Sequence, residues 1–176
     1  MIKIMLGVLF FTIITLVVFL NLDPNIVQNS IVETTSIQSD FITATLSGEI
    51  QKPGTYIVKK EGQLSDMIAL AGGVTTNADD TAYQLTLIVQ SGGHYYIAPK
   101  FDPNDVCGTT ALVKVGINSG NRDNLMTLSN IGTSLANAVI DYRQTNGSFQ
   151  YLEQIMAVPG IGQSTFTRIK NYINLL

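Results

Sequence analysis

The chain has 176 residues, a formal net charge of −3 and a sequence isoelectric point near 4.9. This length suits one or two small domains rather than a single large one. The acidic balance argues against a nucleic-acid partner for the chain as a whole, and a single cysteine, Cys107, excludes an intramolecular disulfide. We interpret Cys107 as a small, partly buried residue of a linker, and an intermolecular disulfide is the alternative.

The N-terminal segment is apolar enough to cross a membrane. The 19 residues of 4–22 carry no charge. As a helix they would extend about 28 Å, close to the ~30 Å hydrocarbon core of a bilayer. A cleaved signal peptide is the alternative, but no small-x-small cleavage site follows the apolar run. We therefore predict an uncleaved, single-pass anchor within residues 1–22. Because Lys3 precedes it and Asp23 follows it, we expect the remaining chain outside the cell.

A polar segment and then a small α+β unit follow the anchor. Residues 23–40 are rich in Asn, Gln, Ser and Thr, and we interpret them as an extracellular tether. Beyond them, alternating and helical apolar patterns separated by Gly and Pro turns predict a compact unit with one helix. The expected strands are 41–50, 55–58, 85–89 and 94–98, and the expected helix is 64–71.

Four separated landmarks in this unit resemble the SLBB family of soluble-ligand-binding β-grasp domains. They lie at residues 46–56, 64–73, 78–79 and 94–99. The resemblance implies a β-grasp fold over 41–101 and names no ligand. We expect His94 to be a half-buried strand residue rather than a ligand or a catalytic base.

A degenerate repeat with a period of 30 residues follows a linker at 102–110. Residues 128–134 (Leu-Ser-Asn-Ile-Gly-Thr-Ser) return as 158–164 (Val-Pro-Gly-Ile-Gly-Gln-Ser). Each copy predicts a short helix, a tight hairpin and a longer helix. Asn121 is the expected N-cap of the first helix. We expect the last helix to reach Leu176. A helix that begins at such a hairpin presents free N–H groups and the positive end of its dipole. Both features favour anions such as a run of phosphates.

Charge is segregated along the chain. Residues 23–110 contain four Lys against ten Asp or Glu, whereas residues 111–176 contain five Lys or Arg against three Asp or Glu. The positive part therefore coincides with the hairpins, which is compatible with modest phosphate binding.

The repeat resembles a tandem helix-hairpin-helix domain over 111–176. Residues 117–120 and 138–149 match further segments of the same pattern. With the anchor and the SLBB unit, the whole chain resembles the ComEA family of competence DNA receptors. The resemblance implies capture of extracellular double-stranded DNA, without sequence specificity, for uptake through a membrane channel during transformation. It also implies an α+β protein with a transmembrane helix and an all-α DNA-binding domain, located in the cell membrane.

We expect the backbone of the two hairpins to contact phosphates, with Gly132 and Gly162 at φ > 0 and open to close approach. Asn130 stands where the family has Gly, and it tolerates φ > 0 better than other residues. Neither hairpin is followed at once by Lys or Arg, and we expect weak, strongly salt-sensitive binding. The predicted DNA-binding residues are Asn130, Ile131, Gly132, Thr133, Ser134, Gly160, Ile161, Gly162, Gln163, Ser164, Arg143, Arg168 and Lys170.

No arrangement of residues supports catalysis. The acidic pair Asp79-Asp80 lacks the partners of a metal site, and we interpret it as solvated. We therefore predict no enzymatic activity, no metal and no cofactor. The rival function is an anchored ligand- or glycan-binding SLBB protein whose helical domain is a protein-interaction module. A third role is self-association through the SLBB domain, which would cluster receptors.

Overall fold

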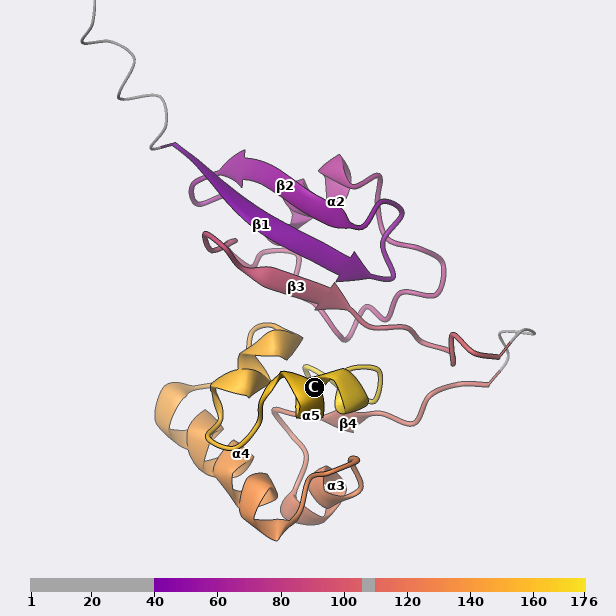
Figure 1. Cartoon of the computed structure of the whole chain (residues 1–176), viewed down its shortest axis with the longest axis vertical. Coiled ribbons are helices and arrows are strands. Elements are labelled where there is room, and N and C mark those ends of the chain that lie inside the picture. The colour runs from indigo at the N-terminus through magenta and orange to yellow at the C-terminus, as the bar shows by residue number, and fades with distance from the viewer. Residues whose placement is uncertain (1–39, 106–109) are drawn as a thin grey trace, which may run out of the picture. The chain divides into compact units, whose positions relative to one another are not determined.

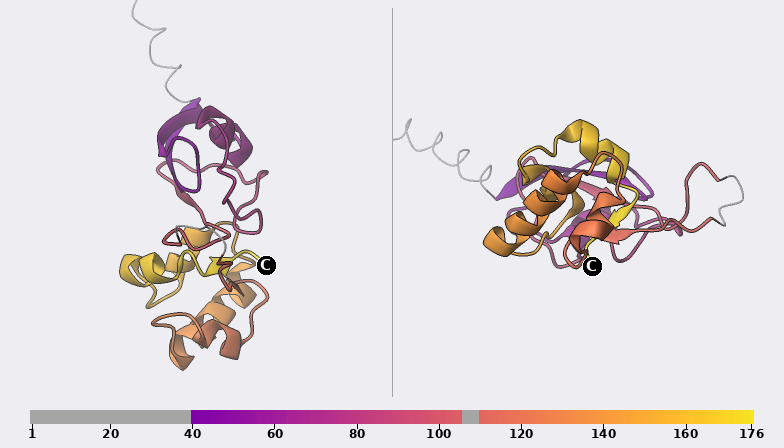
Figure 2. Two further views of the ribbon diagram at one scale, coloured as in Figure 1. Left: turned by 90° about the vertical axis from the view of Figure 1, so that its right-hand side faces the viewer. Right: turned by 90° about the horizontal axis from the view of Figure 1, so that it is seen from below.

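The structure, a computed structural model, describes residues 40–105 and 110–176. Figures 1 and 2 show two groups of elements, with β1, β2, α2 and β3 in indigo to magenta and the later helices in orange to yellow. The elements are β1 (Phe41–Gly48), β2 (Gly54–Lys59), α2 (Leu64–Leu70), β3 (His94–Ile97), β4 (Val115–Gly116), α3 (Arg122–Met126), α4 (Thr133–Asn146), the 3-10 helix η4 (Leu152–Ala157), α5 (Gln163–Ile169) and β5 (Ile173–Asn174).

The first group is a three-stranded sheet with one helix. The strand order is β2-β1-β3; β1 pairs with β2 antiparallel and with β3 parallel. Alternate residues of β1, Ala44 and Leu46, are buried, as one face of a pleated strand requires. Helix α2 buries Leu64, Met67 and Ile68, and it ends before Gly72 and Gly73, which both have positive φ. The predicted mixed α+β arrangement is confirmed.

One predicted strand, 85–89, is wrong. The segment contributes only an isolated bridge between Ile88 and Gln63, and Leu85 and Ile88 are exposed. The physical reason lies in its carbonyl groups. Those of Leu87 and Leu85 accept hydrogen bonds from the N–H groups of Leu64 and Ser65 at the start of α2. These carbonyls cap the helix instead of pairing with a neighbouring strand.

The second group contains both copies of the repeat and one hydrophobic core. Positions 30 residues apart are buried alike: Leu125 with Ile155, and Val139 with Ile169. The copies differ in helix length, because α4 has 14 residues and α5 has only 7. The expectation that the last helix reaches the C-terminus is therefore wrong. The chain leaves the helix after Ile169 and forms β5, which pairs parallel with β4.

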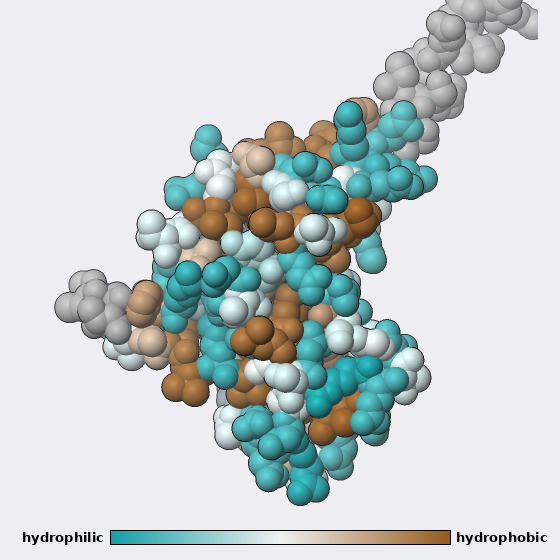
Figure 3. Space-filling model, turned by 180° about the vertical axis from the view of Figure 1, so that it is seen from behind, coloured by the Kyte–Doolittle hydropathy of each residue, from teal (hydrophilic) through white to brown (hydrophobic). Residues whose placement is uncertain are grey.

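Polar and hydrophobic residues alternate over the surface shown in Figure 3. Large hydrophobic side chains that are exposed among the described residues include Ile57, Leu70 and Val113. Within residues 40–105 and 110–176, no helix is both long and apolar enough to span a membrane. The predicted anchor (4–22), most of the predicted tether (23–40) and Cys107 lie outside the described residues.

Candidate nucleic-acid interface

The first hairpin connects α3 to α4 through a tight turn. The N–H of Ile131 donates to the carbonyl of Leu128 at 3.1 Å, and both side chains are buried. Asn130 has φ 65°, so it occupies the left-handed region that asparagine tolerates best among residues with a Cβ. The two apolar side chains anchor the turn in the core, and the residues between and after them face solvent.

The second hairpin repeats this geometry between η4 and α5. Ile161 N–H donates to the carbonyl of Val158 at 3.0 Å, and Gly160, at the position of Asn130, has φ 92°. The apolar pair Val158 and Ile161 is buried like its counterpart. The prediction that Asn130 preserves the turn is confirmed by the matching geometry of the two copies.

The prediction of positive φ at Gly132 and Gly162 is wrong. Both residues are helix N-caps with negative φ, −90° and −104° respectively, because the turn places the left-handed residue two positions earlier. A Cβ built on either glycine would meet no atom within 4 Å. These glycines therefore leave bare backbone next to solvent.

The first turns of α4 and α5 have free N–H groups. Neither N-cap glycine has a side chain that could accept from them. The first N–H groups of a helix have no partner within the helix, so those of Thr133, Ser134, Gln163 and Ser164 are available to an anion. All four residues are exposed. The hydroxyl of Thr133 donates to Met126 Sδ at 3.6 Å.

The two hairpins lie against one another. A Cβ built on Gly160 would come within 2.7 Å of Leu135 Cδ2, so the second turn packs on the first turn of α4. This contact joins the second turn to the helix that begins at the first hairpin.

The three predicted cations lie in different surroundings. Arg143 Nη1 donates to the carbonyl of Ile117 at 2.9 Å, so this guanidinium supports the fold. Arg168 is exposed and borders a recess of about 570 Å³ with Thr127, Leu128 and Ser129, which places it beside the first hairpin. The ammonium of Lys170 lies 4.2 Å from the centroid of the Tyr96 ring on β3, within cation–π range.

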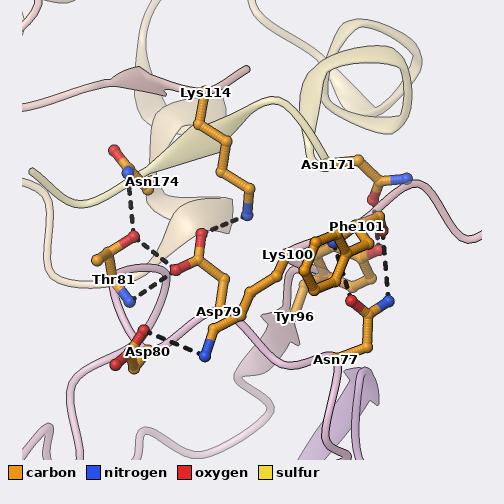
Figure 4. Close-up of polar contacts among 10 residues, drawn as sticks. All are labelled: Asn77, Asp79, Asp80, Thr81, Tyr96, Lys100, Phe101, Lys114, Asn171 and Asn174. Carbon is orange, nitrogen blue, oxygen red and sulfur yellow. Dashed lines mark hydrogen bonds and ion pairs between the residues drawn. The ribbon is translucent and has the colours of Figure 1, made fainter. Parts of the chain in front are cut away.

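A buried polar network connects the helical group to the loop after α2 (Figure 4). Lys114 Nζ lies 2.5 Å from Asp79 Oδ2, and Thr81 donates to the other oxygen of Asp79 through both N–H and hydroxyl. Burial raises the pKa of the Asp79 carboxyl, but the hydrogen bonds from Lys114 and Thr81 outweigh burial and lower its pKa below the ordinary value. The interpretation of Asp79 as a solvated residue is therefore wrong.

The same network fixes the C-terminal strand. Asn174 Nδ2 donates to the Thr81 hydroxyl at 3.0 Å, and the N–H of Leu175 donates to the Thr81 carbonyl at 2.9 Å. Sequence patterns gave no sign of this network, because its members are single polar residues up to 93 positions apart.

A second set of residues that the sequence did not indicate surrounds Tyr96 of β3. Its hydroxyl donates to Asn171 Oδ1, and its ring meets Phe166 edge to face with centroids 6.5 Å apart. Burial raises the pKa of the Tyr96 phenol to about 12, so the phenol remains a donor at neutral pH. Burial also raises the pKa of the Glu153 carboxyl, on η4, to about 8. His94, expected to be half-buried, is exposed.

Among residues 40–105 and 110–176, no group of three or more His, Cys, Asp or Glu side chains is arranged to hold a metal ion. The described residues combine uncapped helix N–H groups with two nearby cations, Arg168 and Lys170, an arrangement compatible with anion binding.

Comparisons with known proteins agree with this geometry. A model of the helix-hairpin-helix motif matches residues 110–174, and a model of the SLBB domain matches residues 43–98. ComE operon protein 1 of Bacillus subtilis (strain 168) is 32% identical over 166 residues, which cover 86% of this chain and 80% of that protein. An uncharacterized protein of Haemophilus influenzae is 33% identical over 61 residues, 34% of this chain and 54% of that protein.

Proposed function

The chain belongs to the ComEA family, which gives it a DNA-binding role in competence, and we propose that it binds double-stranded DNA without sequence specificity for uptake. The observation that supports the manner of binding is the pair of adjacent hairpins, each followed by exposed, uncapped N–H groups. Backbone N–H groups recognise phosphate oxygens, which are the same in every sequence.

The bare glycines support close approach of the DNA. Gly132 and Gly162 have no atom within 4 Å of an added Cβ, so a phosphate can reach the N–H groups of the following residues. Arg168 beside the first hairpin adds charge to this contact. Because few cations take part, we expect weaker binding and a shallower salt dependence than for a strongly basic DNA-binding protein.

We propose that residues 4–22 anchor the chain in the cell membrane with the rest outside, that a membrane DNA-uptake channel receives the DNA, and that the SLBB domain (41–101) mediates self-association. The apolar run and the flanking Lys3 and Asp23 support the topology. A C-terminal tag that stays protected from protease on intact cells would contradict it.

Binding of the full chain to unrelated duplexes tests the mode of recognition. We expect similar affinities for duplexes of different sequence. The logarithm of the affinity should fall linearly with the logarithm of the salt concentration, with a slope on the order of −0.9 per neutralised phosphate. A strong preference for one sequence, or affinity independent of salt, would show that base contacts or other interactions dominate.

A further inference from the structure

A recess between strand β3 and the start of α5 lies directly after the second hairpin. The recess has a volume of about 320 Å³ and is lined from both sequence regions: Ser47, His94 and Tyr96 on one side, and Glu153, Met156, Gln163, Phe166 and Lys170 on the other. Gln163 is the first residue of α5, so the recess begins next to the free N–H groups of the second hairpin.

The polar groups at this recess suit an anion. The ammonium of Lys170 sits 4.2 Å from the Tyr96 ring centroid, and a ring contact of this kind leaves the ammonium able to donate hydrogen bonds elsewhere. His94 is exposed and carries a ring N–H donor in either protonation state. The side-chain amide of Gln163 and the hydroxyl of Ser47 are further donors on the lining.

The one acidic residue of the lining does not oppose an anion at neutral pH. Glu153 is 8% exposed, and its Oε2 is buried without a hydrogen-bond partner among the described residues. Burial raises its pKa to about 8, so the carboxyl is mostly protonated at pH 7. The wall of the recess is then neutral, and Lys170 carries the positive charge.

We propose that this recess is a further phosphate subsite, at which Lys170, His94 and Gln163 contact the phosphodiester backbone of the DNA held by the second hairpin. Tyr96 is a positioning residue, because its ring holds the Lys170 ammonium at the recess. The SLBB domain thus takes part directly in DNA binding. The inference rests on the proposed function and extends the DNA contact beyond the helix-hairpin-helix motifs.

The salt dependence of duplex binding by the full chain tests this subsite. Lys170→Gln should flatten the slope of log affinity against log salt by about 0.9, because one phosphate contact is lost. Lys60→Gln is the matched control, because it removes the same charge from an exposed residue directly after β2, the opposite edge strand. Lys170→Arg keeps the charge and the ring contact and should retain the parent slope.

A second variant tests the contribution of the SLBB domain itself. His94→Ala should weaken duplex binding by about three- to tenfold, the size of one hydrogen bond, with an unchanged melting temperature. The proposed subsite would be rejected if Lys170→Gln and Lys60→Gln showed equal salt slopes, or if His94→Ala bound duplexes with the affinity of the parent. Either result would leave the proposed hairpin contact standing. Absence of duplex binding by the parent chain would instead reject the proposed function.

Discussion

At the scale of single residues, burial raises the pKa of the Glu153 carboxyl to about 8, so this group titrates near neutral pH. Burial is the main cause of its raised pKa, and its own N–H, the N–H of Tyr96 and the charge of Lys170 oppose the shift. Its charge also acts on the phenols of Tyr95, Tyr96 and Tyr151, and His94 lines the same recess. In the folded state the Glu153 carboxyl stays protonated up to a pH of about 8. In the unfolded chain it releases its proton near its ordinary pKa of 4.5.

This difference predicts that the protein loses stability as the pH rises. A group that binds its proton more tightly when folded contributes stability below its unfolded pKa, and that contribution is lost as the pH increases to the folded pKa. The free energy of unfolding of the parent should therefore decrease between pH 5 and pH 8. Glu153→Gln should flatten this decrease and make the protein more stable than the parent at pH 8.

Denaturant unfolding at several pH values measures this effect. Asp141→Asn, an exposed substitution on α4, is the control and should follow the parent curve. If Glu153→Gln and the parent show parallel pH profiles, the carboxyl is ionised in the folded protein and the explanation fails.

At the scale of elements, the second hairpin combines a glycine with positive φ, Gly160, with a glycine of extended backbone, Gly162. Gly160 has φ 92° and an added Cβ would lie 2.7 Å from Leu135 Cδ2, whereas Gly162 has extended backbone and open space. The first glycine is needed to build the turn, and the second keeps the surface bare.

A matched pair of substitutions separates these roles. Gly160→Ala should lower the free energy of unfolding by about 1–3 kcal/mol, because alanine is strained at positive φ and its methyl group meets Leu135. Gly162→Ala should leave stability within about 0.5 kcal/mol of the parent, since nothing opposes the new methyl group. Thermal or urea unfolding of both variants measures the difference, and equal stabilities would show that the turn does not require Gly160.

The sequence predicted helices, caps and turns correctly where a periodic or repeated pattern of residues specifies them. The helix at 64–71, the N-cap at Asn121 and the hairpins all rest on local patterns, and α2, the Asn121 cap and both turns confirm them. The Asn121 side chain accepts from the N–H of Asn124 at 2.8 Å, as its sequence position predicts.

The failures arose where distant contacts override local pattern. Residues 85–89 look like a strand, but their carbonyls cap α2. Residues 170–176 look like a continuing helix, but Val115 and Gly116 pair with Ile173 and Asn174 and draw the chain into β5. The predicted site residues stay predictions, although the structure does bring the two hairpins and Arg168 together.

At the scale of the whole molecule, the contacts between the SLBB and helical parts of residues 40–105 and 110–176 include buried polar pairs beside apolar and aromatic ones. The Asp79–Lys114 pair, the Thr81 hydrogen bonds and the Tyr96–Asn171 hydrogen bond all cross between them. The edge-to-face contact of Tyr96 with Phe166 and the contact of the Lys170 ammonium with the Tyr96 ring place α5, which follows the second hairpin, against β3. This arrangement places β3 beside the surface at which we propose that DNA is held.

The most direct test of the central claim, that hairpin backbone binds DNA phosphates, is duplex affinity of the double variant Gly132→Asp with Gly162→Asp. Both sites have open space and no positive φ, so folding should be preserved, as circular dichroism of the same sample would show. Gln144→Asp with Ser148→Asp adds the same charge in the last turn of α4 and just after it, and is the matched control. We predict that the glycine double variant loses duplex binding while the control retains most of it. A folded glycine double variant that binds duplexes as tightly as the parent would contradict the account.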